Sequence, residues 1–133
     1  MIKQFNVEKA LRDNLKSIAT LAVYGWDNNF EPQVTDSYIL EKCMLGNVAI
    51  TLSPNDSENA NGIYQVDIYT PLATKAKWYG LELRDNLKAN YTKGLTAGIT
   101  GIIINNVNTP SMRMNEANTH RIHTLDINFT VIG

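Results

Sequence analysis

The stretch Asn61-Gly-Ile-Tyr-Gln-Val-Asp-Ile-Tyr-Thr-Pro71 decides how the rest of the chain is interpreted. Its side chains alternate, so that Tyr64, Val66 and Ile68 share one face, as in a strand of an antiparallel sheet with one buried side. Pro71 has no backbone N–H to donate to a ladder, and we expect the strand to end there. The prediction is a strand over 63–70 that stops sharply.

A helical pattern follows this strand from about residue 74 to residue 91. Its apolar stripe is flanked by aromatic residues and widened by Trp78 and Leu81, and Lys93-Gly94 supplies a stop signal. A second amphipathic pattern covers 7–22, with Asn6 as the expected N-cap. Both segments are predicted to be helices that lie on the sheet.

The remaining segments supply the other strands and the loops. We expect a strand over 38–45, a turn at 46–47, a short strand over 48–52 and an exposed loop over 54–62. Further strands are expected over 98–107 and 120–132, separated by a polar loop at 108–118. The strongest alternation in the chain is in the last strand. The predicted fold is α+β: an antiparallel or mixed sheet of about four to five strands with two helices packed on one face, in a single domain over 1–133.

Composition narrows the classes of function. The net charge is −1 and no basic run is present, which argues against specific nucleic-acid binding. No leader and no apolar run long enough to span a membrane is apparent, and the single cysteine fits a reducing compartment. We therefore expect an ordinary globular protein made in a cytoplasm.

Catalytic chemistry is hard to find in this sequence. His120 and His123 are three apart on a predicted strand, which puts them on opposite faces. Cys43 has no adjacent basic partner on its own strand face, because Lys42 belongs to the other face. Glu82 and Asp85 share a helix face with Lys and Arg, as a solvated surface does. Phosphate-binding and nucleophile-elbow motifs are absent. The sequence predicts that the protein is not an enzyme and has no catalytic, cofactor or metal site.

One loop carries aromatic residues without periodicity. Trp26 and Phe30 lie between Gly25 and Pro32, in a segment expected to connect the first helix to the sheet. Aromatic residues in such a loop either cover the core, as a lid, or anchor a partner protein. The lid over the core is the favoured interpretation.

The segment 62–132 resembles the tail terminator, or tail completion, proteins of long non-contractile phage tails. The strand Gly62-Ile-Tyr-Gln-Val-Asp-Ile-Tyr-Thr-Pro71 is similar to their "G-x-[FY]-Q-V-x-[IV]-[FY]-x-P" strand, and Ala76 to Leu87 matches their helix with Leu83-Arg84 in place. A Lys93-Gly94-Leu95 turn, a loop at Thr109-Pro110-Ser111 and a closing strand, Leu125-Asp-Ile-Asn-Phe-Thr-Val131, continue the resemblance. Residues 46–61 depart from it, because the Pro and Gly pattern expected before the strand is missing.

This resemblance implies a structural virion protein at the head-proximal end of the tail, assembled in the host cytoplasm. It implies a homohexameric ring that caps the tail tube, stops its polymerisation and presents the head-joining surface. The implied partners are other copies of the chain, the major tail tube protein and the head–tail connector protein. Candidate assembly contacts lie in the predicted loops: Trp26, Phe30, Asn55, Asp56, Glu58, Arg113 and Met114.

Two other hypotheses remain open. The chain could be a head-closure or connector protein of the same virion. It could also be a small α+β hydrolase or ligand-binding domain, which would need a pocket lined by His123, Cys43 or Asp67.

Overall fold

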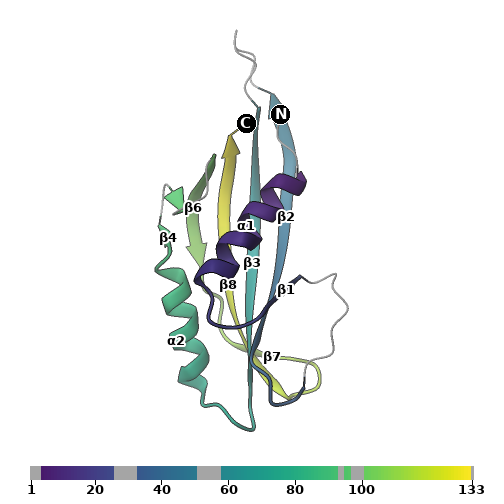
Figure 1. Cartoon of the computed structure of the whole chain (residues 1–133), viewed down its shortest axis with the longest axis vertical. Coiled ribbons are helices and arrows are strands. Elements are labelled where there is room, and N and C mark those ends of the chain that lie inside the picture. The colour runs from purple at the N-terminus through teal and green to yellow at the C-terminus, as the bar shows by residue number, and fades with distance from the viewer. Residues whose placement is uncertain (1–3, 26–32, 51–57, 93–94, 97–100, 133) are drawn as a thin grey trace.

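The computed structural model describes residues 4–25, 33–50, 58–92, 95–96 and 101–132, and it forms an α+β fold with two layers (Figure 1). The main sheet has six strands in the order β1-β2-β3-β8-β6, with β7 paired to β8 beside this path. Strands β4 and β5 form a separate two-stranded sheet. The α+β class and the mixed sheet are confirmed, with more strands than the four to five expected.

The elements follow the chain in a simple order. The N-terminal part consists of α1 (Gln4–Ile18), β1 (Val23–Gly25), β2 (Tyr38–Ile50) and β3 (Glu58–Pro71). The C-terminal part consists of α2 (Lys77–Lys88), β4 (Tyr91–Thr92), β5 (Leu95–Thr96), β6 (Ile102–Asn108), β7 (Arg113–Met114) and β8 (His120–Ile132). Among the described strands, β1 pairs in parallel with β2, and the other pairs are antiparallel.

The stretch that decides the fold is the centre of the sheet. β3 pairs with β2 on one side and with β8 on the other along nearly its whole length. It ends at Pro71, as predicted, and a turn in which the Lys75 N–H donates to the Pro71 carbonyl leads to α2. Gly62 lies opposite Phe129, and a Cβ at Gly62 would come 2.5 Å from the Phe129 ring. The glycine therefore lets the buried aromatic ring cross β3.

Both helices cover the same face of the sheet, as predicted (Figure 1). The core between them and the sheet combines α1 and α2 side chains with alternate residues of β3 and β8. Its main members are Val7, Leu11, Leu15, Tyr64, Val66, Ile68, Leu87, Leu125, Ile127 and Phe129. We call this side the helix face and the opposite side the open face.

Four predictions about turns, loops and connections are wrong. Gly46-Asn47 is not a turn: β2 continues to Ile50, and a register shift between Leu45 and Val48 marks a β-bulge. The described end of the predicted loop 54–62 is strand from Glu58 onward, because Ala60 is buried and its backbone pairs with both neighbouring strands. The predicted connection from Tyr24 onward and the polar loop 108–118 also contain the short strands β1 and β7.

The helices are shorter or shifted relative to the sequence patterns. α1 begins before Asn6, so Asn6 is a helical residue and not the N-cap. α2 begins at Lys77 after an extended Ala76, and its first turn exposes 74% of Trp78. The prediction that Trp78 widens the buried stripe is therefore wrong, while Gly80 and Leu87 are buried as expected.

Candidate functional site: the open face of the sheet

The open face is built by side chains that alternate with those of the core. On β3 these are Ile63, Gln65, Asp67 and Tyr69, whose neighbours across the ladder come from β2 and β8. The end of this face at the start of β2 is covered, and the opposite end, at the start of β3, is exposed. The two ends therefore have different roles.

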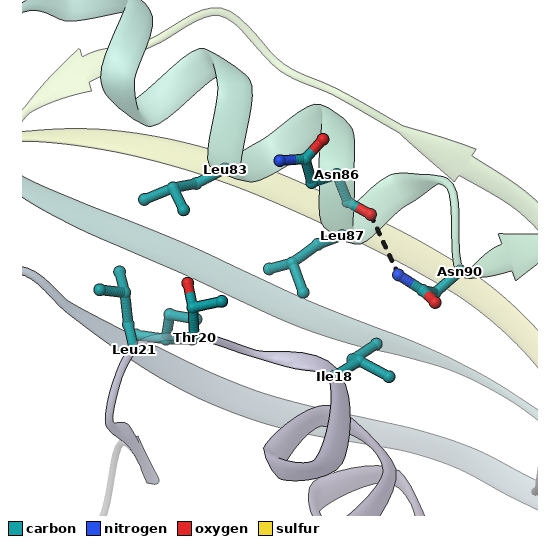
Figure 2. A pocket seen from close by; sticks show the side chains of 8 residues that line it. Ile18, Thr20, Leu21, Leu83, Asn86, Leu87 and Asn90 are labelled. Carbon is teal, nitrogen blue, oxygen red and sulfur yellow. Dashed lines mark hydrogen bonds between the residues drawn. The ribbon is translucent and has the colours of Figure 1, made fainter.

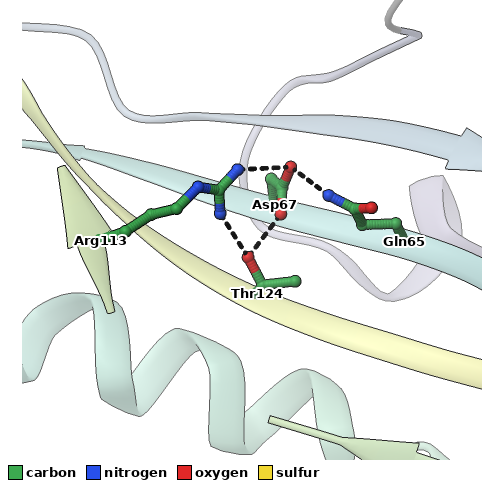
Figure 3. A network of polar contacts seen from close by, with 4 residues as sticks. All are labelled: Gln65, Asp67, Arg113 and Thr124. Carbon is green, nitrogen blue, oxygen red and sulfur yellow. Dashed lines mark hydrogen bonds and ion pairs between the residues drawn. The ribbon is translucent and has the colours of Figure 1, made fainter. Parts of the chain in front are cut away.

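A buried carboxylate organises the covered end (Figure 3). Asp67 is fully buried and accepts a hydrogen bond from the Thr124 hydroxyl at 2.6 Å and another from the Gln65 amide at 2.9 Å. Arg113 of β7 reaches the same carboxylate at 3.5 Å and donates to the Thr124 hydroxyl at 3.0 Å. A buried charge needs such partners, so the network fixes β7 against the sheet.

An aromatic cluster continues the covered end. Tyr38 and Tyr69 stack with ring centroids 4.7 Å apart, and His120 packs against both rings. The two ring nitrogens of His120 lie 2.9 Å from the Thr119 hydroxyl and from the Asp36 carbonyl. Burial raises the pKa of Tyr38 to about 12. These contacts make the cluster a structural support for the covered end.

The exposed end of the open face presents mixed side chains on neighbouring strands. Met44 and Ile63 face each other across β2 and β3 and are 39% and 38% exposed, which is high for apolar residues in the middle of a sheet. Polar side chains surround them in ladder positions: Lys42, Asn61, Gln65, Asn106, Asp126, Asn128 and Thr130. An apolar centre with a polar rim is the usual composition of a protein-contact surface. We call this group the contact surface.

Neighbouring groups shift the pKa of Asp126, a residue of the contact surface. Burial raises the pKa of the Asp126 carboxyl, and the nearby Asp67 carboxylate raises it further, while Arg113 lowers it. Two hydrogen bonds also link the strands here: Asn105 Nδ2 donates to the Thr130 hydroxyl at 2.9 Å, and that hydroxyl donates to Asn61 Oδ1 at 2.7 Å. The contact surface is therefore ordered by its own hydrogen bonds.

Few of the predicted contact residues lie on this surface. Arg113 and Met114 form β7, where Arg113 is held by Asp67 and Met114 is 39% exposed. Glu58 begins β3 and does not belong to a loop, which corrects its predicted setting. The other four predicted contacts, Trp26, Phe30, Asn55 and Asp56, lie outside the described residues.

Sequence reasoning missed the contact surface itself. The signal was present in the strand over 38–45, where neither face is cleanly apolar, and in the apolar Ile63 among the polar residues of its face. Two other exposed apolar side chains, Phe5 and Val34, were not singled out, whereas Trp78 was expected to belong to the apolar stripe of its helix.

The residues proposed for a catalytic or ligand pocket are not brought together. Cys43 and His123 belong to the helix face, on strands separated by β3, whereas Asp67 belongs to the open face. Burial, with smaller contributions from Glu8 and Glu41, raises the pKa of the Cys43 thiol to about 12, which disfavours a thiolate nucleophile. Within the described ranges, no group of three or more His, Cys, Asp or Glu side chains is placed to hold a metal ion.

The helix face has a groove between the end of α1 and the second half of α2 (Figure 2). It encloses about 130 Å³ and is lined mainly by aliphatic side chains, including Leu21, Leu83 and Leu87. Asn90 closes one end, where its side-chain amide donates to the Asn86 carbonyl at 3.0 Å. None of the described residues that line the groove is ionisable.

Ion pairs fix the first helix over the same face. Arg12 Nε donates to the buried Glu41 carboxylate at 2.8 Å, which joins α1 to β2.

Among the described residues, no helix is long and apolar enough to cross a membrane.

Comparisons with known proteins agree with the architecture and leave the function open. No family model matches the chain, and no curated protein matches it. Sixteen chains of solved structures match it, and one of them, which carries no functional description, has a TM-score of 0.73 at 14% sequence identity. That match covers 98% of this chain and 96% of the other. At this identity the similarity shows a shared fold that extends over the full length of both chains.

Proposed function

We propose that this protein is a tail-terminator subunit of a long non-contractile phage tail. In this role copies of the chain form a ring, expected to be a hexamer, on the head-proximal end of the tail tube. The ring stops polymerisation of the tube protein and offers its other side to the head–tail connector protein. The role is structural, and the chemistry needed is protein–protein recognition.

The sequence resemblance supports this proposal because it follows the elements that organise the fold. The matching strand is β3, the central strand of the sheet, and the matching helix and closing strand are α2 and β8. Two positions of the resemblance have local physical reasons, since Gly62 accommodates Phe129 and Pro71 ends the strand before α2.

The observation that carries the proposal is the one-sided construction of the sheet. The two helices bury the helix face, and β7 with the aromatic cluster covers one end of the open face. The contact surface around Met44 and Ile63 is left exposed although it belongs to the longest strands of the molecule. A subunit that works through assembly needs such a surface, and a heterologous contact between copies closes into a ring when the rotation between them closes.

Tail length gives the decisive test. Deleting the gene from the phage or prophage that carries it should give overlong or polydisperse tail tubes in negative-stain electron micrographs, because no ring stops polymerisation. Complementation with the wild-type gene should restore uniform tails. Tails of normal length in the deletion strain would refute the terminator assignment.

A pull-down separates the terminator from the connector role. The tagged protein is mixed with the purified tail tube protein or with the portal or adaptor protein of the same phage. Ile63→Asp, on the contact surface, should abolish capture of the tube protein, whereas Val34→Asp, at an exposed apolar position outside that surface, should preserve it. Capture of the portal or adaptor protein alone would favour the head-closure role.

A further inference from the structure

His123 of β8 is buried without a polar partner beneath α2. The side chain is fully buried, and neither ring nitrogen has a hydrogen-bond partner among the residues that the structure describes. Gly80 of α2 packs directly over the ring, where even a Cβ atom at Gly80 would overlap the imidazole. The helix backbone therefore packs against the Cδ2–Nε2 side of an imidazole that has no hydrogen-bond partner among the described residues.

The charges around this imidazole are positive. Lys77 and Arg84 act on it from α2, and Arg121 acts on it from β8. From β3 its nearest neighbours on this face are Ile68 and Thr70, which carry no charge, and the Thr70 hydroxyl lacks a partner as well. The carboxylate of Asp85 on α2 is exposed and lies 3.8 Å from Arg84. An imidazolium at this position would face three cations, and no carboxylate among the described residues compensates them there.

We propose that His123 makes the docking of α2 an acid-sensitive latch, in which protonation of the imidazole releases α2 from β3 and β8 while the sheet stays paired. The attachment of β3 to β8 differs in kind from the attachment of α2 to these strands. β3 and β8 share a continuous backbone ladder from Asn59 to Pro71, whereas α2 is attached through side chains such as Leu87 and through the contact of Gly80 with His123. The helix is consequently the part that separates first.

The direction of the effect follows from proton linkage. Burial, reinforced by Arg84, Arg121 and Lys77, lowers the pKa of His123 from 6.5 to about 4 in the docked state. A released α2 leaves the imidazole in water, where it binds a proton below pH 6.5, so falling pH favours release between pH 6.5 and 4. One linked proton raises the population of the released state about tenfold per pH unit, or about 300-fold across this window. Above pH 6.5 the imidazole is neutral in both states, and α2 stays docked.

Hydrogen exchange on the intact chain tests this proposal. Exchange rates, corrected for the intrinsic effect of pH, are measured by mass spectrometry between pH 7 and pH 4.5. The α2 amides should lose protection about tenfold per pH unit below pH 6.5, while the central β3 and β8 amides retain theirs. Simultaneous loss of protection in helix and sheet would overturn the proposal, because acid would then unfold the whole domain.

Neutral replacements of His123 assign the effect to this residue. His123→Phe keeps a flat ring under Gly80, and His123→Gln provides a second neutral variant should the first fail to fold. Either variant should abolish the pH dependence of α2 exchange. His120→Gln is the matched control, because His120 belongs to the open face and is hydrogen-bonded, and it should leave the pH dependence intact. An unchanged pH dependence in the folded His123 variants would refute the proposal.

Discussion

The two faces of the sheet show how one set of strands can serve two purposes. The helix face is a continuous apolar core that fixes the fold, with Tyr64, Ile68 and Phe129 fully buried. The open face has polar supports at one end and an exposed mixed surface at the other. Neighbouring residues of β3 therefore belong either to the buried core or to the more exposed open face, according to the direction in which they point. Matched substitutions on the two faces can test this division.

The largest difference is expected between Ile68 and Ile63, which are isoleucines of the same strand. Ile68→Ala removes a fully buried side chain and should lower the free energy of unfolding by about 2–5 kcal/mol. Ile63→Ala removes a side chain that is 38% exposed and should cost about 1 kcal/mol or less. Urea unfolding followed by circular dichroism measures both. Equal losses would mean that the open face is as much a part of the core as the helix face.

The covered end of the open face should behave as an intermediate case. Thr124→Val keeps the shape of the side chain but removes the hydroxyl that donates to the buried Asp67 carboxylate. We expect a loss of about 1–3 kcal/mol, because a buried charge loses a hydrogen bond. Thermal or urea unfolding gives the value, and Arg113→Ala in a double-mutant cycle should show coupling with Thr124. Additive losses would contradict a connected network.

Gly80 tests the close approach of α2 to the helix face. Gly80→Ala improves intrinsic helix propensity by about 1 kcal/mol but places a methyl group against the His123 ring. We expect a net loss of about 1–2 kcal/mol, since overpacking of a fixed ring outweighs the gain.

The decisive comparison for Gly80 is made in a His123→Ala background. There the methyl group has room, and Gly80→Ala should stabilise the protein instead. A stabilising effect of Gly80→Ala in the wild-type background would show that the ring moves aside at little cost.

The smallest effect is expected at Thr130 on the exposed end of the open face. Thr130→Val removes hydrogen bonds with Asn105 and Asn61, whose groups water can satisfy equally well. The free energy of unfolding should change by no more than about 0.5 kcal/mol in the same urea experiment. A loss as large as that of Thr124→Val would remove the distinction between the two ends of this face.

The sequence predicts best the elements whose pattern is local and complete. β8 was expected over 120–132 and occupies those residues, because its apolar and polar side chains alternate with hardly a break. The stop at Pro71 was equally clear, since a proline cannot donate to the ladder. The two helices were found with approximate ends, as periodicity identifies a face more reliably than a terminus.

What the sequence did not predict depends on tertiary pairing. Glycine and asparagine are common in turns and in bulges alike, so Gly46-Asn47 gave no sign that β2 continues. The polar residues 58–61 form strand because β2 and β8 pair with them, and not because of their own propensity. The contact surface likewise arises from four strands, β2, β3, β6 and β8, and no single stretch of the sequence reveals it.

The position of β8 has a consequence for how the chain reaches its structure. β8 lies between β3 and β6 in the sheet, and its side chains complete the core under both helices. Until β8 pairs, β3 has a vacant edge and β6 lacks its ladder partner, so a partly folded chain presents open strand edges. Closing the loop from β3 to β8 also brings together residues some sixty positions apart, which places this domain among the slower folders for its size. Pairing of β8 thus completes both the sheet and the core.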